Sequence, residues 1–369
     1  MAQWLVSASV SHPVSFLHYT NLRSYSPIFN IMSLMNTLLK QRSPQGISTP
    51  ISRDASPIAH CTTCGLYRLN FDIIYYIASI LDASTMQIWR KTCPCAEHAV
   101  LAVLNARYDG LLSKYVSKPA EFRAVLHMPK AVVSGSAALH ILDVDGRGAW
   151  EPKDIDVYTP IGMSMRFVKY LEGEGFRVAQ CQSSSESYQD DYAGFKTVVH
   201  AVKGTLTVDV IQSTTLSALH PLPYFWSTHV MNFLTADSFC IAYPAFTLQG
   251  LGLTNPIALD DRRYPRQRTL DVMAKYKARS YDFRLHPHAW EADVHAKCRQ
   301  AEGCPLSIRW FGDRFCLMGS LIAVDMTLDG TASLLPDNTR TVRWWRGGDA
   351  CGGQCLHTKP SRFHGAVGK

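Results

Sequence analysis

Five residues in the middle of the chain have the types and order needed to act on a phosphate. Gly135-Ser136 follows a short apolar run and opens a helical pattern. A glycine at such a turn lets an anion approach the free amides of the helix start. Asp154 and Asp156 alternate with apolar residues, so a strand would place both carboxylates on one face. Asp209 stands between two valines in a later strand-like run.

The three aspartates together indicate a divalent metal site. Two carboxylates side by side repel each other unless a cation lies between them. Hard oxygen ligands in this arrangement suit Mg²⁺ or Mn²⁺. Asp209 also needs a partner in an apolar strand, and a metal shared with Asp154 and Asp156 would provide one.

The elements that must position these residues are a strand, a helix, a second strand and a β-hairpin. A tight turn at Lys203-Gly204 joins the two hairpin strands. The predicted ranges are 131–133 and 154–158 for the strands, 135–142 for the helix, and 195–202 and 205–211 for the hairpin.

This order of elements and motifs resembles the DNA polymerase beta-like nucleotidyltransferase fold. The stretches SGSAAL, WEPKDIDVY, VDVIQS, STHVMNFLT and AYPAFTL are together similar to a group of uncharacterised fungal nucleotidyltransferase-like proteins, over about residues 69–320. One difference is the loop from Asp143 to Lys153, which is longer than in many active members.

The resemblance implies nucleotidyl transfer from a nucleoside triphosphate to an unknown hydroxyl acceptor. Gly135 and Ser136 would bind the β- and γ-phosphates, and Asp154 and Asp156 would ligate two divalent ions. Asp209 would complete the second metal site and orient or deprotonate the acceptor hydroxyl. Pyrophosphate would leave by in-line displacement.

Other interpretations of the same residues stay open. Gly135-Ser136 can be an ordinary turn and helix cap, and Asp154 and Asp156 can be a solvated strand edge. The core would then be a non-catalytic adaptor, or a pseudo-nucleotidyltransferase domain that binds without turnover.

A short helical region precedes this core. The stretch LNFDIIYYIASILDASTMQIWRKTC resembles an F-box, which implies a ubiquitin-ligase partner bound through residues 69–115. It departs from the F-box pattern at Asn70, where proline is usual, and it lacks a tryptophan shortly after Cys93. The alternative is a helical cap that packs on the next domain.

Downstream of the core the residues are less specific. Residues 227–234 predict a helix, and a surface position is favoured for His229 over one that lines the pocket. Asn232 would bond a substrate or buttress a turn. Arginines precede another helix through Tyr276, and a solvated face is favoured over phosphate binding because no aromatic residues interleave with them. These arginines are Arg262, Arg263, Arg266 and Arg268.

The chain has 11 cysteines, and no signal-peptide pattern opens it. We therefore expect reduced thiols and an intracellular location, either cytoplasmic or nuclear. A mitochondrial leader is the weaker alternative. A structural Zn²⁺ site is a weak expectation, since the spacing of its ligands fits no common finger pattern. The candidate ligands are Cys298, Cys304 and Cys316, and the pairs Cys61/Cys64 and Cys351/Cys355 are weaker still.

Composition limits the class of protein. The 369 residues are 47% hydrophobic and 18% charged, which is typical of a globular chain, and no apolar run is long enough for a bilayer. The net charge of +7 is spread along the sequence and hints only at anionic ligands. The predicted class is α+β, with a nucleotidyltransferase-like mixed sheet flanked by helices. The predicted regions are a disordered leader (1–64), an F-box-like helical module (65–127), the core (128–280) and a partly irregular Cys-rich region (281–369).

Overall fold

The computed structural model describes most of the chain after the predicted leader. The described residues are 66, 69–143, 150–183, 194–260, 264–290, 302–323 and 342–347, with the backbone of 365–367. All of them belong to one compact unit, Pro57–Lys369. The predicted leader (1–64) lies outside the described residues, as do Cys298, Cys351 and Cys355.

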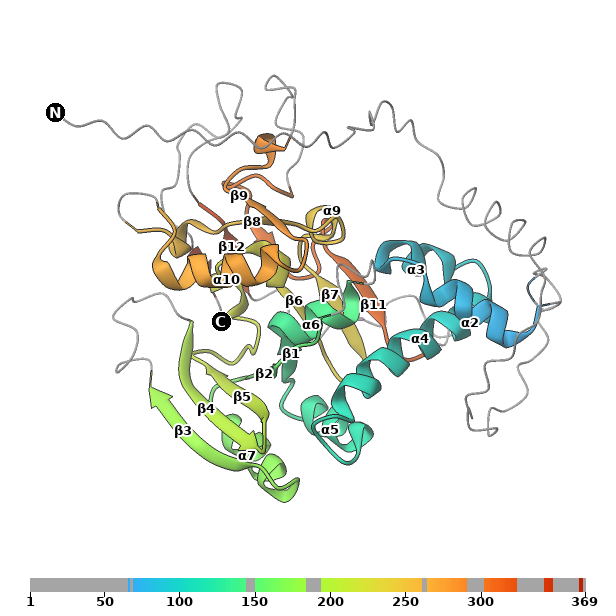
Figure 1. Cartoon of the computed structure of the whole chain (residues 1–369), viewed down its shortest axis with the longest axis horizontal. Coiled ribbons are helices and arrows are strands. Elements are labelled where there is room, and N and C mark those ends of the chain that lie inside the picture. The colour runs from blue at the N-terminus through green and yellow to red at the C-terminus, as the bar shows by residue number, and fades with distance from the viewer. Residues whose placement is uncertain are drawn as a thin grey trace, which may run out of the picture. The chain divides into compact units, whose positions relative to one another are not determined.

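Among the described residues, eight strands form one mixed sheet in the order β11-β7-β6-β1-β2-β5-β4-β3 (Figure 1). β2 and β5 run parallel, and the other neighbouring pairs run antiparallel. The chain therefore combines helices with a mixed sheet, which is compatible with the predicted α+β class. The strands are β1 (Val132–Ser134), β2 (Asp154–Thr159), β3 (Arg177–Ser183), β4 (Phe195–Lys203), β5 (Leu206–Ser213), β6 (Asn232–Leu234), β7 (Ser238–Ile241) and β11 (Leu317–Ser320).

The predicted strand, helix, strand and hairpin are confirmed, with one shift at the turn. β1 leads directly into α6 (Gly135–Leu142), and β4 and β5 form the hairpin. Lys203 pairs with Leu206, so the turn residues are Gly204 and Thr205 rather than Lys203 and Gly204. This one-position correction matters because it decides which side chains face each other across the hairpin.

The two faces of the sheet near β2 and β5 differ in character. Val208 and Val210 are buried on one face, where α7 (Ser164–Gly173) packs against β3, β4 and β5. Ser164 of α7 donates a hydrogen bond to Gln212, which lies on the same face as these valines. The opposite face carries Asp156 and Asp209, so the valine row holds the sheet to a helix and leaves the aspartates on the other side.

Within the described residues four helices precede the sheet, and each buries part of its apolar surface. They are α2 (Phe71–Ser79), α3 (Ala83–Trp89), α4 (Pro94–Leu112) and α5 (Pro119–His127). α2 begins after Asn70, whose side chain accepts from the Asp72 amide, and α3 begins after Asp82, whose side chain accepts from the Ser84 and Thr85 amides.

These helices are hydrogen-bonded to the sheet. Arg90 donates to the carbonyl of Ser320 at 2.6 Å, and Arg123 donates to the carbonyl of Ala236 at 2.7 Å. Asn105 donates to the carbonyl of Leu321 at 2.8 Å. The helical region therefore packs on the core through fixed contacts from α3, α4 and α5.

The C-terminal region also contributes to the core. β11 is an edge strand of the large sheet, although the sequence placed it in the Cys-rich region. Trp344 of β12 (Arg343–Trp345) is fully buried and packs with Phe233 and Phe311, within the region 281–369 that the sequence predicted to be partly irregular. β12 pairs with β10 (Arg309–Trp310) and β13 (Gly365–Val367).

The predicted helix at 227–234 is wrong. A short 3₁₀ turn, η3 (Thr228–Val230), is followed directly by β6. His229 is fully buried rather than on the surface, because the rings of Trp226, Tyr276 and Phe283 enclose it. Asn232 donates to the carbonyl of His229 at 2.7 Å and so buttresses the turn.

The remaining elements follow β5 in the chain. The longest is α10 (Gln267–Lys277), which the sequence predicted up to Tyr276. The others are η2 (Leu222–Tyr224), α9 (Pro244–Thr247), β8 (Leu251–Leu253), η4 (Pro256–Ala258), β9 (Asp282–Arg284) and η5 (Pro287–Ala289), with β8 and β9 pairing in parallel.

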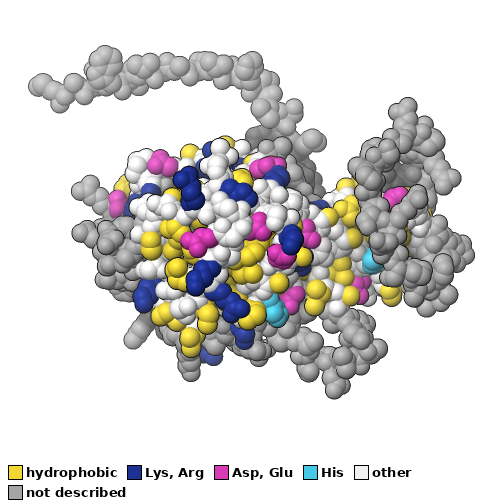
Figure 2. Space-filling view, turned by 90° about the horizontal axis from the view of Figure 1, so that it is seen from below, with side chains coloured by type: hydrophobic (Ala, Val, Ile, Leu, Met, Phe, Trp, Pro, Cys, Tyr) yellow, Lys and Arg dark blue, Asp and Glu magenta, His cyan; other side chains and the backbone are white. Residues whose placement is uncertain are grey.

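The described surface is mixed in character. On the face seen in Figure 2, basic and acidic side chains are interspersed among apolar ones rather than gathered by sign. No helix in the described ranges is both long and apolar enough to span a bilayer.

Candidate functional site

The Gly-Ser turn lies directly against a carboxylate. Gly135 has a φ of +66°, a conformation that favours glycine. A Cβ atom at this position would stand 2.5 Å from Oδ2 of Asp156, so any other residue would collide with the carboxylate. Ser134, one residue earlier, pairs with Asp156 across β1 and β2. The glycine is therefore required by the approach of Asp156 as well as by the turn.

The strand register brings the three predicted aspartates to one face. Asp156 and Asp209 are direct partners in the parallel pairing of β2 and β5. Asp154 lies two residues before Asp156, and alternation puts it on the same face. The Ser136 hydroxyl donates to Oδ1 of Asp154 at 3.4 Å. Gly135, Ser136 and the three aspartates are thus neighbours in space.

The negative charges of Asp154 and Asp209 make ionisation of Asp156 less favourable. Burial, followed by the negative charges of Asp154 and Asp209, raises the pKa of Asp156 well above its usual range. Asp156 keeps some contact with solvent although protein surrounds its carboxylate. Lys275 of α10 lowers this pKa and offsets part of the shift. The cluster is left with negative charge that the surrounding side chains only partly neutralise.

Asp209 has an additional partner in the hairpin. His200 of β4 pairs with Asp209 in register, and its Nδ1 lies 2.8 Å from Oδ1 of Asp209. Burial raises the pKa of Asp209, while the hydrogen bond and charge of His200 lower it. His200 therefore fixes the orientation of the third carboxylate.

Two tyrosines border the same charges, Tyr115 from the turn after α4 and Tyr276 from α10. Burial, followed by the charges of Asp154 and nearby acids, raises the pKa of Tyr115 to about 12. Burial is likewise the main cause that raises the pKa of Tyr276 of α10, and Asp156 and Asp154 add to it. Both phenols remain protonated at neutral pH and are hydrogen-bond donors beside the carboxylates.

The carboxylate cluster fits a divalent cation in its donor chemistry. Asp154, Asp156 and Asp209 offer hard oxygen donors, which Mg²⁺ and Mn²⁺ prefer. Burial is the main cause of the raised pKa of Asp156, and a cation would relieve the repulsion from Asp154 and Asp209 that adds to it. Within the described ranges no three acidic, histidine or cysteine side chains already stand in a metal-holding arrangement. Ligation would therefore require these carboxylates to turn toward a common point.

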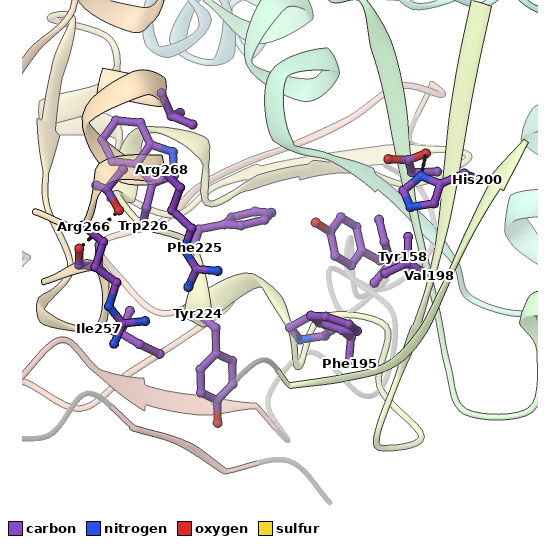
Figure 3. A pocket seen from close by; sticks show the side chains of 16 residues that line it. Tyr158, Phe195, Val198, His200, Tyr224, Phe225, Trp226, Ile257, Arg266 and Arg268 are labelled. Carbon is purple, nitrogen blue, oxygen red and sulfur yellow. Dashed lines mark hydrogen bonds and ion pairs between the residues drawn. The ribbon is translucent and has the colours of Figure 1, made fainter. Parts of the chain in front are cut away.

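A cavity of about 420 Å³ opens beside Asp209 (Figure 3). Tyr158, Val198 and His200 line it from the sheet, and Arg266 and Arg268 line it from the opposite side. The remaining lining residues are mostly apolar or aromatic, namely Phe195, Ile211, Pro221, Tyr224, Phe225, Trp226, Ile257, Ala258, Thr269 and Val272.

No family model matches this chain. Comparison with protein-family models, with curated proteins and with solved structures finds no match for it. The residues and their geometry are therefore the grounds for assigning a function.

The sequence missed several residues of this site. His200 was not singled out, although the corrected hairpin turn places it opposite Asp209. Arg266 and Arg268 were assigned to a solvated helix face, but both line the cavity, and Arg268 is also exposed. Arg262 and Arg263 lie outside the described residues. The lining aromatics come from segments distant in sequence, so spacing alone carried no signal for them.

The long loop and the candidate zinc ligands are only partly described. Asp143 accepts a hydrogen bond from the Tyr281 hydroxyl, while residues 144–149 lie outside the described ranges. Cys304 is buried and Cys316 is partly buried. Burial and a hydrogen bond with Cys316 raise the pKa of the Cys240 thiol, so Cys316 has a thiol neighbour on β7.

Proposed function

We propose that this chain binds a nucleoside triphosphate with divalent metal ions and transfers its nucleotidyl group to a hydroxyl acceptor. The observation that carries the proposal is the meeting of Gly135 with Asp156, and of Asp156 with Asp209, on one face of the sheet. A glycine that opens a helix against a row of carboxylates offers backbone amides to phosphate and oxygen ligands to metal within one site.

The electrostatics of the aspartate cluster support binding of a triphosphate together with metal cations. Burial, followed by the like charges of Asp154 and Asp209, raises the pKa of Asp156, so the ionised form of this part-buried cluster is unfavourable for the fold. Such a cluster is typical of a functional site, because metal ions bound with a triphosphate would neutralise it.

The proposed reaction is an in-line displacement. The acceptor hydroxyl oxygen would bond to the α-phosphorus as the bond from that phosphorus to the bridging oxygen breaks, and pyrophosphate would leave with the electron pair. Asp209, held by His200 through Oδ1, would accept the hydroxyl proton. Bound Mg²⁺ or Mn²⁺ would stabilise the charge on the phosphates. Gly135 and Ser136 would hold the departing β- and γ-phosphates.

Calorimetry with the full-length chain tests the proposal. ATP and GTP are titrated with and without Mn²⁺ into the wild type and into an Asp154→Asn/Asp156→Asn variant. Mn²⁺-dependent binding that the variant loses is the expected result. Equal binding in both proteins, or none in either, would show that these carboxylates hold no nucleotide-bound metal. An Asp282→Asn variant, in β9 and away from the cluster, is the control for a simple loss of charge.

An adaptor function is the second candidate, and the exposed side chains of α2 and α3 favour it. Four large apolar side chains there keep 38% to 54% of their surface exposed, namely Ile73, Tyr76, Ile80 and Ile88. In an F-box-like module such side chains would meet helices of a ligase scaffold. Co-purification of a scaffold with the full chain, lost in a Tyr76→Asp/Ile80→Asp variant, would support this candidate.

A further inference from the structure

We infer that the cavity beside Asp209 is an acceptor pocket, and that it takes a small phosphorylated compound with an aromatic ring. The inference deepens the proposed function and rests on it, because an acceptor has meaning only if a nucleotidyl group is transferred. It follows from the position of the cavity along the strands and from the chemistry of its two walls.

The cavity and the Gly-Ser turn lie on different sides of the carboxylates. Ser134 is level with Asp156, so the chain turns at Gly135 and Ser136 beside the start of β2. The cavity lies toward the other end of the strand, where Tyr158 stands about 6–7 Å beyond Asp156. Ile211 has the same relation to Asp209 on β5.

Lining residues confirm this separation. Asp209 is the member of the aspartate cluster that lines the cavity, together with its partner His200. Gly135, Ser136 and Asp154 do not line it. A triphosphate held at the turn would therefore reach the carboxylates from one side, and a molecule in the cavity would reach Asp209 from the other.

The walls of the cavity select an aromatic ring. Tyr158 and Phe225 pack edge to face, with ring centroids 5.8 Å apart, and both line the space. Phe195, Tyr224 and Trp226 add further aromatic surface around it (Figure 3). A flat ring gains both apolar burial and favourable ring contacts in such a space. The volume of about 420 Å³ is in the range of small-molecule sites.

The wall contributed by α10 selects an anion. Arg266 immediately precedes the helix, and Arg268 lies in its first turn. Both guanidinium groups line the cavity opposite the sheet. Each guanidinium has five N–H donors in a planar fork that matches phosphate oxygens. The carboxylate side of the cavity would repel an anion, so its phosphate would lie at the arginine side and its hydroxyl near Asp209.

The transfer that follows conserves atoms and charge. The ligand's hydroxyl oxygen would bond to the α-phosphorus of the triphosphate, its proton would pass to Asp209, and pyrophosphate would leave from the Gly135 side. The product would be a phosphodiester between the nucleotide and the ring-bearing compound.

Calorimetry without metal or triphosphate tests the pocket by itself. The probe is 5′-AMP, with adenosine as the ring without phosphate and ribose 5-phosphate as the phosphate without ring. AMP should bind at least about tenfold more tightly than either fragment, because each loses one of the two walls. An Arg266→Gln/Arg268→Gln variant should lose at least about tenfold in AMP affinity, whereas Arg166→Gln on α7 should not.

A second variant guards against misfolding of the arginine variant. Val272→Phe would fill the cavity from α10 without removing a charge, and it should also weaken AMP binding by at least about tenfold. Circular dichroism and unchanged Mn²⁺–ATP binding would show that both variants are folded. AMP binding that is absent from the wild type, or equal in all these proteins, would overturn the assignment of the cavity.

A competition experiment decides between acceptor and donor. AMP is titrated into the full chain saturated with Mn²⁺ and the unreactive analogue α,β-methylene-ATP. Affinity for AMP within about threefold of the value without the analogue supports a separate acceptor pocket. Exclusion of AMP would show that the cavity holds the triphosphate's own base, and the acceptor assignment would fail.

The two proposals fail in different experiments. AMP binding to the cavity should persist in the Asp154→Asn/Asp156→Asn variant, since neither residue lines the cavity. AMP binding without Mn²⁺–ATP binding would overturn the nucleotidyl transfer alone. Mn²⁺–ATP binding without AMP binding would overturn the acceptor pocket alone.

Discussion

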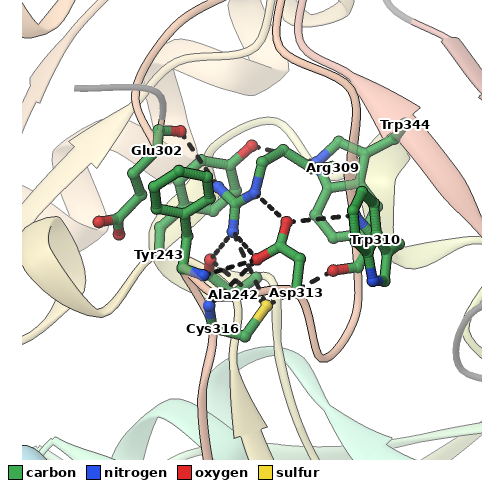
Figure 4. Close-up of polar contacts among 9 residues, drawn as sticks. Ala242, Tyr243, Glu302, Arg309, Trp310, Asp313, Cys316 and Trp344 are labelled. Atoms are coloured by element: carbon green, nitrogen blue, oxygen red, sulfur yellow. Dashed lines mark hydrogen bonds and ion pairs between the residues drawn. The ribbon is translucent and has the colours of Figure 1, made fainter. Parts of the chain in front are cut away.

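Two charged clusters in this molecule, one buried and one part-buried, follow opposite rules. Arg309 and Asp313 are both almost fully buried and form a two-point ion pair, with distances of 2.5 Å from Nε to Oδ2 and 3.1 Å from Nη2 to Oδ1 (Figure 4). Asp154, Asp156 and Asp209 are instead like charges on one face of the sheet, and their partial neutralisation comes from Lys275 and His200.

The number of polar partners distinguishes a structural ion pair from a cluster of functional charges. Arg309 also donates to the carbonyls of Ala242 and Glu302, and Asp313 accepts from three backbone amides that follow Arg309. Nearly every polar atom of that pair thus has a partner, as a buried pair needs if it is to hold a fold together. The aspartate cluster lacks such compensation within the described residues, so its charges are better explained by a ligand.

Breaking the ion pair should have the largest effect on stability. Arg309→Met would leave Asp313 buried without its counter-charge, and it should lower the free energy of unfolding by about 3–5 kcal/mol. Chemical denaturation followed by tryptophan fluorescence measures this change. A loss below about 1 kcal/mol would show that the pair is not structural.

Gly135→Ala should have the next largest effect. The new Cβ would meet the Asp156 carboxylate at 2.5 Å, and the φ of +66° is strained for alanine. The expected loss is about 1–3 kcal/mol in unfolding free energy, with weaker Mn²⁺–ATP binding. Gly204→Ala is the matched control, because its φ is +61° but nothing lies within 4 Å of the added atom. Equal losses for the two variants would show that the contact with Asp156 has no role.

Asp156→Asn should stabilise the fold while removing function. The amide carries no charge and can donate to a neighbouring carboxylate, so the repulsion within the cluster falls. An increase of about 1 kcal/mol in unfolding free energy is expected in metal-free buffer, the usual size for a group retained for function. Thermal denaturation of the two proteins measures it. Destabilisation by Asp156→Asn would show that the aspartate cluster stabilises the fold, as the Arg309–Asp313 ion pair does.

The stability gained by Asp156→Asn should depend on pH. This effect should be smaller than the three above, and its direction follows from the raised pKa of Asp156. The folded-state pKa of Asp156 is raised, so its ionisation destabilises the fold at high pH, and this penalty shrinks as the pH falls from the raised pKa toward the ordinary pKa of an aspartate. The advantage of Asp156→Asn over the wild type should therefore be larger at pH 8 than at pH 4. An advantage that grows as the pH falls would contradict the raised pKa.

Local patterns predicted the strands of the site but not the cavity. Alternation along 154–158 and the valines around Asp209 identified β2 and β5, because buried strands impose a period of two. The parallel pairing of Asp156 with Asp209 depends on the intervening β3, β4 and α7, which local patterns do not specify.

The sequence would have identified His200 if the hairpin turn had been predicted at the correct two residues. Two-residue hairpin turns fix the register, and Gly204-Thr205 instead of Lys203-Gly204 sets His200 against Asp209. His229 was misplaced for a different reason. Its neighbours predicted a helix, whereas long-range packing with Tyr276 and Phe283 buries it in an aromatic cluster.

The most direct test of the central claim is a comparison of thermal stability for the wild type and Asp156→Asn, each with and without Mn²⁺ and α,β-methylene-ATP. If the carboxylates exist to bind a metal-bound triphosphate, the order of stability reverses. The variant should be more stable in metal-free buffer, and the wild type should be more stable once both ligands are present, because ligand binding stabilises only the protein that binds. The same order of stability under both conditions would contradict the claim.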